Sequence, residues 1–182
     1  LSDAILVAYN NGVQLSDNDR LLLFVNNWTG CCAVGSLGTW TISTPYGIRT
    51  ISISWLPIWS YNNNPGLHVI GHEYGHNLGF WHSGNVYQTY DSPWDTVSGG
   101  CNPEGAHTIA KNKIDSGWLT GNEAITISST QFLQTTIYPI TQANGVRAIT
   151  ITTPDPSITF TIESRINQGH DLCLPNQGII IE

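Results

Sequence analysis

The stretch that decides the fold is HEYGHNLGFWH, residues 72–82. Its histidines His72 and His76 are four residues apart, which on an α-helix puts them one turn apart on the same face, as two ligands of one metal ion require. If the helix continued, His82 would be rotated by about 240° and would lie about 9 Å further along, too far for metal bonds of about 2.1 Å. The helix is therefore predicted to end at Gly79, because glycine adopts the left-handed conformation that lets the chain turn back.

The residue types in this stretch predict a catalytic zinc site. Neutral imidazoles suit zinc, and three protein ligands leave a fourth position for water. Glu73 is predicted to be the base that accepts a proton from this water, whose pKa the metal lowers to roughly 7. A lone helical histidine is more often a surface or core residue, but five fixed identities at these spacings arise by chance with a probability of about 10⁻⁵. The sequence thus predicts one bound Zn²⁺ ion and does not decide whether a structural calcium ion is also bound.

Beyond these residues, the chain resembles a known family. The stretch fits the extended zinc signature of the metzincin metallopeptidases. Three further segments resemble gametolysin-like and immune-inhibitor-A-like secreted peptidases: YDSPWDTVSGG (90–100) before the turn beneath the zinc, IAKNKIDSGWL (109–119) as the following helix, and TIESR with GHDLCLPNQGIII (161–181) as a distal β segment. The resemblance implies an α+β fold with a mixed twisted sheet, an active-site helix, a C-terminal helix and a small packed β subdomain. It also implies that protein or peptide substrates lie extended along a sheet edge.

One feature departs from the metzincin pattern. These peptidases carry a methionine in the turn below the metal, and this chain has no methionine. By alignment of PWDTVSGG, that position falls to Val97, with Ser98 as the alternative. An apolar valine can keep the floor of the site packed, although a smaller side chain can leave space under a metal centre. Gly79 and Val97 are therefore the predicted structural supports of the site.

Composition limits the classes of partner. The chain has 182 residues, of which 40% are hydrophobic and 10% are charged, and 6 Lys or Arg against 13 Asp or Glu give a net charge of −7. Nucleic acids and anionic membrane surfaces are disfavoured as partners, because proteins bind both through clustered basic residues, which this chain lacks. No apolar run approaches the length of about 20 residues that crosses a bilayer. We expect a monomer, although the sequence leaves the oligomeric state open.

Cysteines and a sequon indicate secretion. Four cysteines allow three pairings. Adjacent cysteines bond to each other only with strain, since their Cα atoms are about 3.8 Å apart and disulfides prefer about 5.5 Å. Cys31 and Cys32 are therefore expected to reach separately to Cys101 and Cys173; a thiolate zinc site is disfavoured because close Cys pairs are lacking. With the glycosylation sequon at 27–29, these features predict a secreted, extracellular glycoprotein.

The first residues, LSDAILVAYNNG, lack the basic flank of a signal peptide. We therefore expect a chain that is already processed and starts inside a helix. Similar peptidases usually carry a propeptide, so the resemblance implies a zymogen. Whether an upstream segment has been removed or the region is abbreviated is left open.

Hydrophobic periodicity predicts the elements. A helix is expected at 3–9, and strands are expected at 20–26, 39–43 and 50–57. Residues 60–66 are predicted to be a loop, with Pro65 in the first turn of the motif helix, and a second helix is expected at roughly 104–115. After Leu119 the pattern alternates, which predicts strands at 124–127, 147–152 and 158–163 with turns at 144–145 and 154–156. We therefore expect a catalytic domain at 1–119 and a packed β subdomain at 120–182.

Three other side chains are candidates with weaker signals. His68 shares the face of His72 but would lie too far from a metal held by the other three histidines, so a structural role is favoured. Tyr90 and His107 are candidate donors to an oxyanion, although buried packing is the commoner role of each.

Together these observations lead to the hypothesis of a secreted zinc endopeptidase that uses a metal-activated water and Glu73 as general base. One alternative is a catalytically weak or inactive binding module on the same fold, which the missing methionine favours and the intact Glu73 opposes. Another is a zinc hydrolase of small amides, which a closed pocket would favour. Cleavage specificity is not readable from the sequence.

Overall fold

The computed structural model describes residues 1–26, 33–62, 66–84, 87–100 and 105–182. It has an α+β fold with two mixed sheets and divides into two compact units, Leu1–Trp81 and His82–Glu182. The predicted domain boundary after Leu119 is a separate hypothesis that these units do not test. Within the described residues, every helix is too short or too polar to span a bilayer.

The first unit is organised around one long strand. β4 (Gly47–Pro57) pairs through its second half with β1 (Arg20–Val25) in parallel and with β2 (Val34–Gly35) antiparallel. Its first half forms a hairpin with β3 (Trp40–Thr44). The predictions for β1, β3 and β4 are confirmed, and β2 was missed because two residues are too few to show a period. Since β2 and β3 follow each other along the same edge of β4, residues 36–39 are a break in one edge strand.

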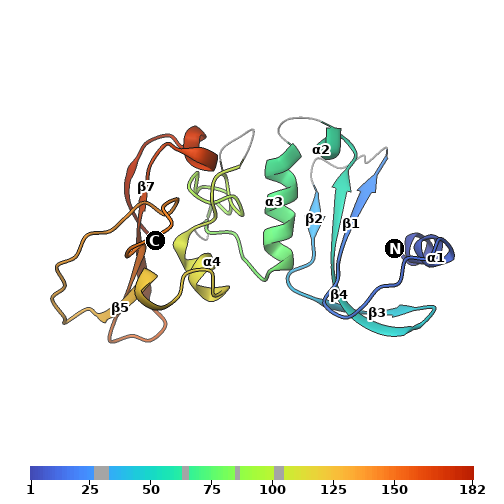
Figure 1. The fold of residues 1–182 in the computed structure, drawn as a ribbon, viewed down its shortest axis with the longest axis horizontal. Helices are drawn as coiled ribbons and strands as arrows, with labels where there is room; N and C mark the ends of the chain where they lie inside the picture. The colour runs from blue at the N-terminus through green and yellow to red at the C-terminus, as the bar shows by residue number, and fades with distance from the viewer. Residues whose placement is uncertain (27–32, 63–65, 85–86, 101–104) are drawn as a thin grey trace. The chain divides into compact units, whose positions relative to one another are not determined.

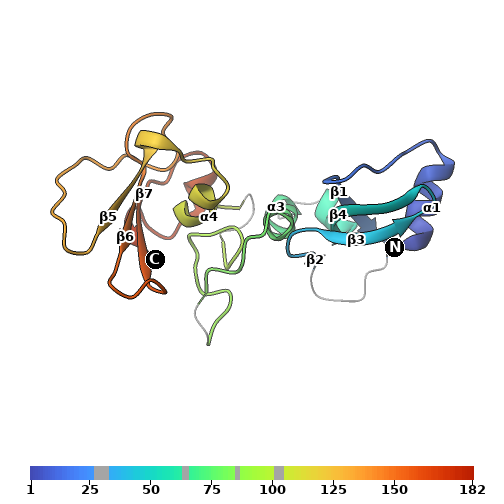
Figure 2. The same cartoon turned by 90° about the horizontal axis from the view of Figure 1, so that it is seen from below.

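The two faces of β4 carry different side chains. Ile51 and Ile53 are fully buried in the apolar cluster that includes α1 (Ser2–Asn10), where a helix was predicted. Side chains alternate across a strand, so Ser54 lies on the opposite face, where it bonds to α3 (Gly66–Asn77). Figure 1 and Figure 2 show α1 and α3 on opposite sides of this sheet.

The predicted loop at 60–66 is partly wrong. Residues Trp59–Asn62 form a short helix, α2. The Ser60 hydroxyl donates to the carbonyl of Pro57 over 2.7 Å, and this local bond stabilises a helical turn that periodicity does not reveal. Residues 63–65, including the proline expected in the first helical turn, lie outside the described residues.

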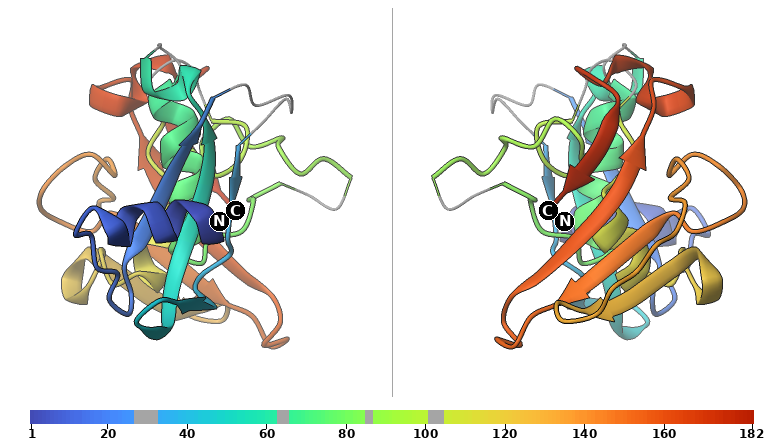
Figure 3. Two further views of the ribbon diagram at one scale, coloured as in Figure 1. Left: turned by 90° about the vertical axis from the view of Figure 1, so that its right-hand side faces the viewer. Right: turned by 90° about the vertical axis from the view of Figure 1, so that its left-hand side faces the viewer.

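The second unit contains the sheet β5-β6-β7-β8. β5 (Ala124–Ser128) and β6 (Ala148–Thr152) are parallel, and β7 (Thr159–Arg165) and β8 (Gly178–Ile181) continue the sheet antiparallel (Figure 3). The three strands predicted after Leu119 are confirmed. β8 falls in the segment for which the resemblance implied β structure.

The second predicted helix is shorter than expected. α4 covers Ala110–Asp115 and lies beside β7 (Figure 2). Gly105 has a φ of +77°, and Ile109 is extended with a ψ of 158°, so the backbone is not helical before Ala110. Residues 101–104 are outside the described part.

The interior of the second unit is partly polar. A small apolar cluster joins Ala110, Leu119, Ile140 and Ala148. On β7, however, the buried side chains are Thr161, Glu163 and Arg165. The 3-10 helices η1 (Gly121–Glu123) and η2 (Gly169–Cys173) complete the unit.

Candidate metal centre

The helix α3 ends as the motif predicts. Gly79 has a φ of +92°, and its N–H donates to the carbonyl of His76 over 2.9 Å. The N–H of Phe80 donates to the carbonyl of Gly75 over 3.0 Å. These two bonds form the glycine-terminated helix end known as the Schellman motif. The chain therefore leaves the helix axis before His82, as the ligand spacing requires.

The three histidines of the motif form a group that fits a metal ion. Nε2 of His72 lies 3.2 Å from Nε2 of His76, and one ring nitrogen from each of His72, His76 and His82 lies within 4.8 Å of the others. Tetrahedral ligands about 2.1 Å from zinc stand about 3.4 Å apart. The close pair therefore has the separation of two zinc ligands.

The tautomer of His76 also suits metal binding. Its Nδ1 lies 2.8 Å from the carbonyl oxygen of Phe80. Because a carbonyl only accepts, Nδ1 carries the proton and Nε2 presents its lone pair to the His72 side. The helix end thus orients a ligand, since Phe80 is the first residue after Gly79.

Glu73 is buried next to these ligands. Its side chain is 6% exposed, and the N–H of Gly35 on β2 donates to its carboxylate. Burial raises the pKa of Glu73 to about 7, and the hydrogen bond from Gly35 opposes this rise. A cation held by the neighbouring imidazoles would oppose it further. Burial therefore brings the pKa of this carboxyl toward neutral pH, the range in which a carboxyl can both accept and return a proton.

Gly35 permits the close approach of β2 to α3. A Cβ at this position would lie 2.6 Å from the carbonyl oxygen of Glu73 and 3.1 Å from its Oε2. Any larger residue would push the strand away from the base. Sequence analysis did not identify Gly35, because only the pairing of β2 with β4 brings it to Glu73.

Asn77 fixes the last turn of α3 to the sheet. Its buried amide donates to the carbonyl oxygens of Ser36 and Ile53 over 3.0 and 3.2 Å, and Ser54 donates to its Oδ1 over 2.9 Å. The N–H of Gly38 donates to the carbonyl of His76 over 2.8 Å. Sequence analysis missed Asn77, for which the only signal was an amide directly after the second motif histidine.

The remaining candidates lie in different surroundings. The His68 ring is 6.2 Å from the His72 ring, and burial lowers its pKa. The Tyr90 ring is 4.4 Å from the His82 ring. Val97 is fully buried, and its N–H donates to Asp95 over 3.1 Å. Its place beneath a metal stays a prediction.

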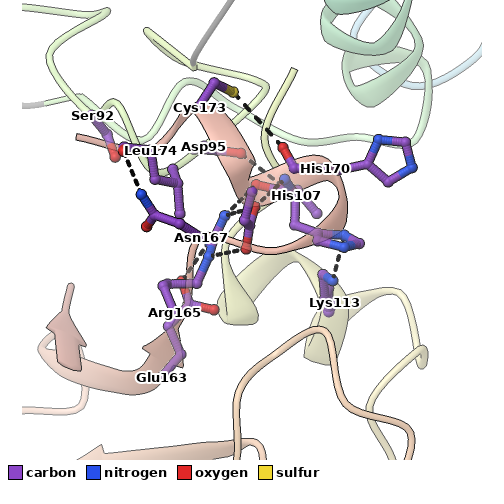
Figure 4. Close-up of polar contacts among 12 residues, drawn as sticks. Ser92, Asp95, His107, Lys113, Glu163, Arg165, Asn167, His170, Cys173 and Leu174 are labelled. Atoms are coloured by element: carbon purple, nitrogen blue, oxygen red, sulfur yellow. Dashed lines mark hydrogen bonds and ion pairs between the residues drawn. The ribbon is translucent and has the colours of Figure 1, made fainter. Parts of the chain in front are cut away.

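His107 has partners of another kind. Its Nδ1 lies 3.2 Å from Nζ of Lys113, and its ring is 5.6 Å from that of His170. Arg165 donates to the backbone carbonyl of His107 over 3.1 Å (Figure 4), and the N–H of His107 donates to Asp171 over 2.9 Å. His107 therefore belongs to a separate polar cluster of the second unit.

A comparison with known protein families gives one match. The sequence profile of the dual-action HEIGH metallo-peptidases matches residues 5–125, which is more than half of the 182 residues. No curated protein and no solved structure matches the chain. The five letters of the family's name correspond to HEYGH at 72–76, where Tyr74 replaces isoleucine at a position that is 38% exposed. The matched region contains the three histidines, the buried glutamate and the helix-ending glycine, and the chain belongs to the dual-action HEIGH metallo-peptidase family.

Proposed function

We propose that this metallopeptidase is a secreted zinc endopeptidase in which Glu73 is the general base. The observation that carries the proposal is the 3.2 Å separation of the His72 and His76 nitrogens, with a buried carboxyl on the same helix. A zinc ion bound there would acidify a water molecule and polarise the scissile carbonyl. The site would then need a base that is neutralised and regenerated near pH 7, which is the role assigned to Glu73.

Each residue of the site has a defined task in this proposal. His72, His76 and His82 hold the metal, and Glu73 accepts a proton from water and returns it to the leaving amine. Tyr90 is proposed as a donor to the oxyanion because its ring lies against His82. His107 is not assigned this task, because it lies in the separate polar cluster with Lys113 and His170.

The substrate is proposed to lie along β2 (Val34–Gly35). Among the described residues, β2 pairs with β4 alone, and an extended peptide can add to such an edge through backbone hydrogen bonds. Gly35 is also in contact with Glu73. A strand bound along β2 would therefore pass the proposed base, which favours peptides over small amides.

Secretion is part of the proposal and rests on other residues. Cys173 is disulfide-bonded, which supports an oxidising location. Cys31, Cys32 and Cys101 lie outside the described residues, as does the sequon at 27–29, so the pairing and the glycosylation remain predictions. The gametolysin-like character, the zymogen and the monomeric state are likewise proposed.

The proposal is tested by comparing the wild type with Glu73→Gln on an unfolded protein substrate, with and without a chelator. We expect one zinc ion per chain in both proteins by elemental analysis. Glu73→Gln should lower kcat by a factor of about 10²–10⁴, the usual contribution of a general base. The chelator should abolish cleavage by the wild type.

Two histidine variants on the same helix provide the matched control. His76→Gln should lose zinc and activity, whereas His68→Gln should keep both. If the wild type binds zinc but cleaves no protein, the inactive binding module is the better account. If cleavage survives Glu73→Gln unchanged, the assignment of the base is wrong.

A further inference from the structure

The second unit contains a cavity outside the zinc motif. Its volume is about 380 Å³, within the range of small-molecule sites. His107 and His170 line it, and their rings stand nearly perpendicular with centroids 5.6 Å apart. Except for His107, the residues around it follow residue 125, where the family match ends.

The proton of the His107 ring can be assigned from its contacts. A lysine ammonium donates and cannot accept, so the 3.2 Å contact between Lys113 Nζ and His107 Nδ1 makes Nδ1 the acceptor. Burial, followed by the charge of Lys113, lowers the pKa of His107 to about 4, so the ring is neutral at pH 7. The pKa of Lys113 is lowered to about 8, so the lysine is still mostly charged there. The single ring proton is therefore on Nε2.

This Nε2–H group is a hydrogen-bond donor with no acceptor among the described residues. No described residue hydrogen-bonds to Nε2 of His107. The ammonium behind the ring polarises it, which strengthens Nε2–H as a donor. The arrangement favours an oxygen acceptor with negative charge and disfavours a metal ion, which would need a lone pair on Nε2.

One buried ion pair holds the backbone next to both imidazoles. Arg165, labelled in Figure 4, is fully buried, and it donates to both carboxylate oxygens of Asp171 over 2.8 Å. Asp171 accepts the backbone N–H of His107 over 2.9 Å and directly follows His170 in η2. The backbone positions of both histidines are thus set before any ligand arrives, which lowers the entropic cost of binding.

We propose that this cavity binds a carboxylate, which accepts a hydrogen bond from Nε2–H of His107. His170 provides the second wall, and the Thr141 hydroxyl and the Gln142 and Gln168 amides offer further donors around it. The carboxylate can belong to the C-terminus of a peptide or to a small free acid. The site does not depend on the proposed peptidase activity.

The test is NMR spectroscopy of the zinc-loaded full chain with ¹⁵N-labelled histidine, in a Glu73→Gln background that prevents cleavage. Without ligand, the spectrum should show the His107 proton on Nε2. N-acetylglycine should shift the signals of His107 and His170 saturably, whereas its amide should bind at least about tenfold more weakly, equivalent to about 1.4 kcal/mol. Acetate distinguishes the sources: equal binding indicates a small-acid site, and weaker binding indicates a peptide terminus.

Variants make the test specific. His170→Ala, at an exposed position, should weaken N-acetylglycine binding by about tenfold. Lys113→Met should also weaken it, because the His107 ring would lose the charge that strengthens its Nε2–H as a donor. Lys111→Met removes the same charge from the same helix and should have no effect. The proposal is overturned if the amide binds as well as the acid, if the proton is found on Nδ1, or if a second equivalent of Zn²⁺ binds both rings in place of the acid.

Discussion

The strands β4 and β7 have similar alternating sequences but bury opposite kinds of side chain. In β4 the fully buried side chains against α1 are Ile51 and Ile53. In β7 the buried face carries Glu163 and Arg165, while Phe160 on the other face is 43% exposed. An alternating pattern therefore predicts a strand in both places, but which face is buried depends on what packs against it.

The apolar interior around β4 and the polar interior around β7 differ in the partners that their buried side chains need. An apolar side chain gains from any dry, well-shaped environment, whereas a buried charge is tolerated only with hydrogen-bonding partners. Arg165 has such partners in Asp171, in Glu163 over 3.0 Å and in the carbonyl of His107 over 3.1 Å. The interior around β7 should thus tolerate fewer replacements than the one around β4, and a single substitution should destabilise it more.

The largest expected effect is therefore that of Asp171→Ala. It leaves Arg165 buried with one carboxylate and should lower the free energy of unfolding of the second unit by about 3–5 kcal/mol. Native-state hydrogen exchange of the β7 amides measures this loss. Replacing the whole triad, as Glu163→Leu with Arg165→Met and Asp171→Leu, should cost less than the single change; a larger cost would mean that the ions themselves stabilise the fold.

Next in size is Ile53→Ala in the apolar interior. Removing buried methyl groups leaves a cavity, so the free energy of unfolding of the first unit should fall by about 3 kcal/mol. Hydrogen exchange of the β4 amides is the measurement, and Ile53→Val, at about 1 kcal/mol, is the matched control. Equal effects of the two substitutions would contradict the close packing inferred for this face.

A smaller expected effect is a dependence of stability on pH that comes from His107 in the second unit. Burial and the charges of Lys113, Arg165 and His170 lower the pKa of His107 to about 4, against the opposing effect of Asp171. Between pH 6.5 and 4 the unfolded chain therefore binds a proton that the folded chain does not, and stability falls as the pH falls. His107→Gln should remove about 1 kcal/mol of this loss between pH 7 and 4.5, a figure reduced for solvent screening. Urea unfolding at both pH values checks it, and identical losses in the two proteins would refute it.

The smallest expected effect is that of Lys111→Ala. Lys111 and Asp115 form an exposed pair on α4, and such pairs contribute less than about 0.5 kcal/mol. Thermal unfolding should show almost no change, with little dependence on salt. A loss above about 1 kcal/mol would show that charge on this helix matters beyond the buried cluster.

Local patterns predicted most of the elements and the metal group. The His72 and His76 spacing, the break at Gly79 and the alternation of Ile51 and Ile53 are all properties of neighbouring residues, and the structure contains the corresponding helix, turn and strand. The α+β class was implied by the family resemblance, and the structure has it.

The missed features depend on residues far apart in the chain. Asn77 bonds to Ser36 and Ile53, which are 41 and 24 residues away, and β2 is recognisable only through its pairing with β4. The late start of α4 and the buried polar face of β7 also follow from tertiary contacts. Rules of residue spacing describe one helix or strand at a time, so they do not predict which distant residues will be in contact.

Two glycines of the metal centre limit substitution for different reasons. At Gly35 the limit is space, because any Cβ meets the backbone of Glu73. At Gly79 a Cβ would meet nothing within 4 Å, yet the φ of +92° is one that L-residues rarely adopt. Position 79 therefore selects by handedness: a D-amino acid prefers the torsion that the helix end requires, so in a chemically synthesised chain a mirror-image alanine would suit this position better than natural alanine.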